Sequence, residues 1–149
     1  MDRNDQIVKW YAIVPAALVA LAVAVPWLLV HSPVLGLALQ RGFALVCHQQ
    51  PERSFVLFGG SVAACARCLG IYLGAALGLV IRVPREFAWR LLLGAAAINL
   101  VDWIAEAGGL HGNWMLARFA LGAALGAAAA LLVRASAGEF RLPAQVDET

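Results

Sequence analysis

Long apolar runs separated by short polar breaks dominate the chain. Four of them cover about residues 8–30, 61–81, 89–107 and 114–133. A bilayer core about 30 Å thick requires about 20 consecutive apolar residues at a helical rise of about 1.5 Å each. The pattern therefore predicts an all-α integral membrane protein with four transmembrane helices.

The polar positions between these runs predict the connections. His31-Ser32-Pro33 ends the first run, and Gln40 and Arg41 interrupt a shorter apolar segment at residues 34–46. This segment is too short to span the membrane, so we expect an interfacial or re-entrant helix. A polar loop follows at residues 47–60.

Glycines recur at every fourth position in the second run, at Gly70, Gly74 and Gly78. Gly122 and Gly126 give the fourth run a shorter version of the same stripe. Residues at this spacing share one face of a helix, and glycines there let a neighbouring helix approach closely. The stripes predict tight helix packing inside the membrane.

Composition agrees with a membrane location. The chain is 62% hydrophobic and 13% charged, with a formal net charge of +2, and its mean hydropathy is +0.80. These values lie outside the usual range for soluble domains. No basic patch with interleaved aromatic residues is present, so we expect the lipid bilayer and not a nucleic acid as the partner. The pattern does not define an oligomeric state.

Basic residues predict the orientation. The first and third connections carry only Arg41 and Arg53. The terminal segments and the second connection carry seven basic residues: Arg3, Lys9, Arg82, Arg85, Arg90, Arg134 and Arg141. Because cytoplasmic loops are enriched in lysine and arginine, we expect a multi-pass protein of the cytoplasmic (inner) membrane with both termini in the cytoplasm.

The same reasoning treats residues 1–149 as a single membrane domain. Within it, the polar residues 134–149 are expected to form a disordered cytoplasmic tail.

The candidate chemistry lies on the outer, periplasmic face. Cys47-His48 and Cys65-x-x-Cys68 contain every cysteine of the chain. Cysteines three apart on a helix share one face, and three thiolates with one imidazole match a tetrahedral zinc site or a copper site. The first prediction is a transition-metal site, zinc or copper, with Cys47, His48, Cys65 and Cys68 as ligands.

Two other functions fit the same residues. A thiol–disulfide oxidoreductase would use Cys65 and Cys68 as the redox pair, Cys47 as the resolving thiol and a quinone as the electron acceptor. A structural or assembly protein would use a disulfide to attach the loop to the second span. A small molecule or a redox partner would approach from the outer face.

Ionisable residues gather at the same depth as the cysteines. Charged groups inside spans are costly and indicate function or pairing. We expect Arg67 to pair with Asp102, with Asp102–Arg118 as a second pairing, and Arg53 to extend to the interface. The residues expected to surround the metal or to contact a substrate are Gln49, Arg53, Arg67, Tyr72, Asp102, Glu106, Asn113 and Arg118.

Two motifs support a family resemblance. Cys47-His48-Gln49-x-Pro51-x-Arg53-Ser54-Phe55 and Cys65-x-Arg67-Cys68-x-Gly70-Ile71-Tyr72-x-Gly74 resemble the CHQxPxRSF and CxRCxGIYxG signatures of a prokaryotic family of small membrane proteins of unknown function. The resemblance continues through Asp102, Asn113, Arg118 and Gly122. Glu106 stands where that family's pattern has glutamine, and Leu121 where it has threonine. The resemblance implies that the cysteine window acts as one unit, and it supplies no activity.

Overall fold

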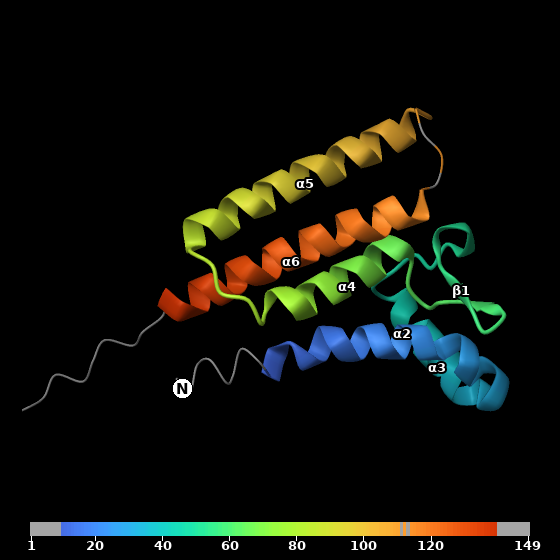
Figure 1. Ribbon diagram of the computed structural model, residues 1–149. Helices are drawn as coiled ribbons and strands as arrows, with labels where there is room; N and C mark the ends of the chain where they lie inside the picture. The colour runs from blue at the N-terminus through green and yellow to red at the C-terminus, as the bar shows by residue number, and fades with distance from the viewer. Residues whose placement is uncertain (1–9, 111, 113, 140–149) are drawn as a thin grey trace, which may run out of the picture.

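The computed structural model describes residues 10–110, 112 and 114–139. Four helices form an up-and-down row in the order α2, α4, α6 and α5 (Figure 1). Their bounds are Ile13–His31, Ala66–Gly78, Met115–Glu139 and Arg85–Ala107, respectively. The start of α2 and the end of α6 lie at the same end of the helix axes (Figure 1). The start of α4, the end of α5 and the start of α6 lie at the opposite end of the helices.

Helices α2, α5 and α6 are long and apolar enough to cross a membrane. They confirm the first, third and fourth predicted segments as helices, with shifted ends. Residues 8 and 9 of the first prediction lie outside the described residues. Helix α6 continues through Arg134 to Glu139, so a tail beginning at residue 134 is wrong in its boundary. Its remaining residues, 140–149, lie outside the described part.

The second predicted span is the main difference. Helix α4 contains 13 residues, where a helix over residues 61–81 was expected. Residues 61–64 are not helical and belong to the preceding loop, because their backbone pairs elsewhere. Val62 N–H donates to Phe55 O at 2.9 Å, and Ala63 N–H donates to Ala22 O at 3.2 Å. At its other end, the buried Arg134 donates to Leu79 O at 2.8 Å and satisfies a carbonyl of the terminal turn.

The protein is mostly helical, as predicted, and the polar loop also contains a small hairpin that the sequence did not indicate. Strands β1 (Val56–Leu57) and β2 (Gly60–Ser61) pair antiparallel. Phe58 and Gly59 connect them with positive φ values of 52° and 78°. Two consecutive left-handed residues make the turn that suits the twist of a two-residue hairpin. A single 3₁₀ turn, η1 (Pro51–Arg53), precedes the hairpin.

Helix α3 (Pro33–Ala44) confirms a short helix in the interrupted apolar segment. It folds back against the end of α2, where a Cβ at Gly36 would lie 2.7 Å from Leu29 N. Only a residue without a side chain allows the two helices to meet there. The turn brings the segment after α3 toward the start of α4.

The glycine stripes position α4 against α6. A Cβ at Gly78 would lie 3.0 Å from Ala127 Cα, and one at Gly70 would lie 2.9 Å from Ala123 N. In return, a Cβ at Gly126 would lie 2.8 Å from Ile71 Cα. The stripes therefore face each other, which confirms the predicted close packing and identifies α6 as the neighbour of α4.

Candidate functional site

Three sulfur atoms meet at the start of α4. Cys47 follows α3, Cys65 is the N-cap of α4, and Cys68 lies in its first turn. Their Sγ atoms all lie within 4.8 Å of one another, and no disulfide joins them. Tetrahedral zinc with bonds of about 2.3 Å separates its sulfur ligands by about 3.8 Å. The three thiols are thus close to the spacing that a single ion requires.

Hydrogen bonds favour a thiolate at Cys65, and the bond that Cys68 donates to Cys65 raises the pKa of Cys68. The backbone N–H of Cys65 donates to Cys47 Sγ at 3.2 Å. A hydrogen bond from the Cys68 thiol, with further bonds from the Cys68 and Arg67 N–H groups and from Cys47, lowers the pKa of Cys65 to about 5 against the opposing effect of burial. The positive end of the α4 dipole acts in the same direction.

Gln49 holds the two cysteine segments together. Its φ of 49° is unusual for a residue other than glycine. The conformation lets its side-chain amide donate to Gln40 O at 2.7 Å and to Ala63 O at 2.9 Å. One amide therefore links α3 to the segment that enters Cys65, which makes Gln49 a support for the site and not a ligand.

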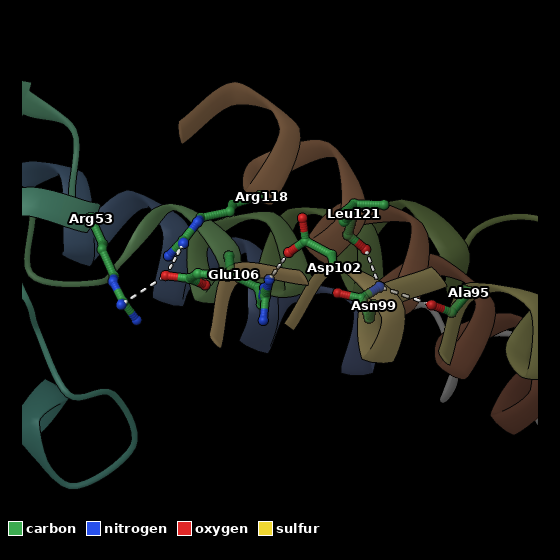
Figure 2. A network of polar contacts seen from close by, with 8 residues as sticks. Arg53, Ala95, Asn99, Asp102, Glu106, Arg118 and Leu121 are labelled. Atoms are coloured by element: carbon green, nitrogen blue, oxygen red, sulfur yellow. Dashed lines mark hydrogen bonds and ion pairs between the residues drawn. The ribbon is translucent and has the colours of Figure 1, made fainter. Parts of the chain in front are cut away.

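Charged side chains form a network (Figure 2), and three of its arginines line the same cavity as the cysteines. Arg67 pairs with Asp102, as the sequence predicts. Arg118 pairs with Glu106 and not with Asp102, and Arg53 lies 2.8 Å from the same Glu106 oxygen. The expected Asp102–Arg118 pairing is therefore wrong, and Arg53, whose side chain is 41% exposed, also pairs with Glu106. Glu106 lies one turn beyond Asp102 on α5, and that turn brings its carboxylate between α6 and η1.

Asn99 extends the network and was missed in the sequence. It is 8% exposed, and its side-chain amide donates to Ala95 O at 2.9 Å and to Leu121 O at 3.0 Å. Asn99 lies three residues before Asp102 and seven before Glu106, which places all three on one helical face. This spacing could have identified Asn99 as part of the polar face from the sequence alone. The polar face of α5 therefore continues deeper than the charged pairs (Figure 2).

A cavity of about 380 Å³ adjoins the three sulfurs. It is lined by Val46, Cys47, His48, Gln50, Arg53, Cys65, Arg67, Cys68, Trp103 and Arg118. His48 lies on the wall but outside the group of ligand atoms within 4.8 Å of one another, so the structure does not bring the predicted fourth ligand to the sulfurs. Trp103 also lies on the cavity wall. Its sequence neighbours are mostly apolar, so the sequence did not indicate that it lines the site.

The predicted site residue Tyr72 lies apart from the cavity lining. Tyr72 packs against the buried apolar cluster that contains Cys47 and Leu69. It supports the site from within the fold. Asn113 lies outside the described residues.

This arrangement supports two kinds of chemistry. Three closely spaced thiols, one of which accepts a hydrogen bond from a backbone N–H group, match a site for a thiophilic metal ion. Thiolates prefer zinc, Cu(I) and iron. The same thiols can also exchange electrons as a dithiol and a disulfide.

Comparisons with known proteins give a family and no activity. The model of the family described as Predicted membrane protein (DUF2085) matches residues 47–132, which include both cysteine motifs and most of α6. An uncharacterized protein of Methanocaldococcus jannaschii is 33% identical over 98 residues, 59% of this chain and 61% of that protein. An uncharacterized protein of Methanothermobacter thermautotrophicus is 52% identical over 33 residues, 22% of this chain and 30% of that protein. The chain thus spans less than two thirds of either relative. No solved structure matches it.

Proposed function

We propose that this chain, which belongs to the family described as Predicted membrane protein (DUF2085), binds a transition-metal ion at Cys47, Cys65 and Cys68. The observation that carries the proposal is the approach of all three sulfurs within 4.8 Å. Zinc and copper are the metals that such thiolates favour. Arg53, Arg67 and Arg118 line the same cavity and offset the negative charge of the thiolates.

The proposed membrane arrangement places this site at the outer face of the cytoplasmic membrane. Helices α2, α5 and α6 cross the bilayer, and α4 makes a fourth, shorter crossing between α2 and α6. Helix α3 lies at the interface beside the hairpin. This arrangement has both termini in the cytoplasm, and its support is the up-and-down helix order and the distribution of basic residues.

Elemental analysis of detergent-purified protein tests the metal. We expect about one zinc or copper ion per chain and loss of that ion in the Cys65→Ala/Cys68→Ala variant. His48→Ala is the matched control, because His48 lies on the cavity wall outside the sulfur group. Unchanged metal content in the double-cysteine variant would exclude the three-cysteine site.

A second candidate function is thiol oxidation linked to a quinone. The lowered pKa of Cys65, next to Cys68, favours it. In that reaction the two thiols lose two electrons and two protons and form a disulfide, and the quinone becomes a quinol. Trapping of free thiols before and after quinone addition distinguishes the two functions. Thiols that remain fully reduced exclude the oxidase.

A further inference from the structure

A proline interrupts the backbone hydrogen bonds of α2. Pro26 lies inside this helix, and proline has no N–H group to donate to the carbonyl of the residue four positions earlier. That residue is Ala22, which is 0% exposed, so water does not reach its carbonyl oxygen. A proline inside a membrane helix is tolerated where a neighbouring group satisfies the freed backbone position. Ala22 O therefore requires a donor from outside α2.

The segment that enters Cys65 supplies this donor. Ala63 N–H donates to Ala22 O at 3.2 Å, and Ala63 is 2% exposed. Gly60 lies beside the proline ring, because a Cβ at Gly60 would be 3.2 Å from Pro26 Cβ. Pro26 therefore provides both an available acceptor and a contact surface at one point of α2, and residues 60–64 are attached to the helix there.

The carbonyl of Ala63 is bonded as well, on the side of the other cysteine segment. It accepts a hydrogen bond from the Gln49 amide at 2.9 Å. Ala22, Cys47 and Ala63 also belong to one buried apolar cluster. Cys65 follows Ala63 by two residues, and its N–H donates to Cys47 Sγ at 3.2 Å. Displacement of Ala63 would therefore move Cys65 relative to Cys47.

We infer that Pro26 is a positioning residue for the thiol site and acts by leaving Ala22 O available to Ala63. An N–H group at position 26 would donate to Ala22 O as in a regular helix and would compete with Ala63 N–H. The inference goes beyond the proposed metal site and rests on it only for the measurement of metal affinity. Because proline disfavours a helix, its removal should affect helix stability and metal binding in opposite directions.

Pro26→Ala tests this role. The variant gains the missing N–H group, so zinc affinity measured against a competing chelator should fall about 10-fold, as expected when a support of a metal ligand is lost. The free energy of unfolding in mixed micelles should not fall, because alanine favours a helix more than proline does. Pro15→Ala is the matched control, since Pro15 lies in the first turn of α2, where an N–H group has no acceptor within the helix. A loss of stability together with the loss of affinity would show general damage to the fold and would overturn the positioning role.

A double variant tests whether the effect passes through Ala63. Pro26 and Gln49 act on the two backbone groups of that residue, so the effects of their replacement on zinc affinity should not be independent. Pro26→Ala with Gln49→Ala should weaken zinc binding by less than the product of the two single effects. Pro15→Ala with Gln49→Ala should give the effect of Gln49→Ala alone. A full product for the Pro26 pair would contradict a shared route through Ala63.

Two measurements on metal-free protein separate this inference from the metal site. Hydrogen exchange at the Ala63 amide should be faster in Pro26→Ala than in the wild type. In a Cys68→Ala background, a bifunctional thiol reagent should bridge Cys47 and Cys65 more slowly once Pro26 is replaced. If the wild type binds no zinc, the metal proposal fails and these measurements alone decide the inference. Unchanged bridging in Pro26→Ala overturns the inference whether or not zinc binds.

Discussion

Replacement of Gly74 by alanine tests whether the approach of α4 to α6 holds the fold together. A methyl group at Gly74 would lie 2.8 Å from the carbonyl carbon of Ala123 and 2.9 Å from its Cα. Carbon atoms in contact prefer about 3.5–4.0 Å. The helices must therefore separate by about 1 Å. The contacting groups are backbone atoms, so no rotation of a side chain can relieve the contact.

The size of the effect follows from two opposing terms. Overpacking of this kind costs about 1–3 kcal/mol, and the rigid backbone places Gly74→Ala near the upper value. The greater helix propensity of alanine offsets about 1 kcal/mol. We expect a net loss of about 2 kcal/mol in the free energy of unfolding, measured by titration with sodium dodecyl sulfate in mixed micelles.

Gly94→Ala is the matched control, because a Cβ at Gly94 of α5 would meet nothing within 4 Å. Only the propensity term applies there, so this variant should be unchanged or more stable by up to about 1 kcal/mol. Equal stability of the two variants would refute the reasoning, since it would mean that the glycines of α4 are not needed for close packing.

Three further predictions concern the site. Gln49→Ala removes both amide hydrogen bonds that join the cysteine segments, so metal affinity measured against a competing chelator should fall about 10-fold, and unchanged affinity would contradict the supporting role. Asn99→Leu should lower the free energy of unfolding in mixed micelles by about 0.6 kcal/mol and by no more than about 2 kcal/mol, because buried polar contacts in membranes contribute little. In metal-free protein, alkylation of Cys65 should persist at pH 6 and decline as the pH falls through about 5, because a lowered pKa keeps the thiolate above that pH. Cys68→Ala should move this decline to higher pH, since the Cys68 thiol is the main cause of the lowered pKa.

Local pattern was sufficient to predict most helices and the centre of the site. The apolar runs predicted α5 and α6, and the spacing of Gly70 and Gly74 predicted a close neighbour because helical periodicity alone determines which face they share. The CxxC spacing placed Cys65 and Cys68 together for the same reason. The Arg67–Asp102 ion pair could be predicted because the two residues have opposite charges and were expected at the same depth in the membrane.

The remaining features depend on contacts between distant segments. Helix α4 begins at Ala66 because Val62 and Ala63 hydrogen-bond to Phe55 and Ala22, and hydrophobicity cannot reveal that pairing. Glu106 was expected near the site, but its selection of Arg53 and Arg118 depends on how α5 rotates against α6. His48 was expected as the fourth ligand because three thiolates and one imidazole match a tetrahedral site, whereas the backbone after Cys47 carries it to the cavity wall.

The pairing of Arg67 with Asp102 has a consequence for synthesis. The two residues are 35 positions apart, so the arginine emerges from the ribosome well before its partner. At about 5–20 residues per second the interval lasts about 2–7 seconds. Arg67 lies in the first turn of α4, where an arginine opposes insertion by less than the roughly 2.5–3.5 kcal/mol of a central position, but α4 has only 13 residues to offset that cost. Helix α4 is therefore expected to wait at the translocon and enter the bilayer with α5, so the proposed metal site reaches its final surroundings only after the second half of the chain has been made.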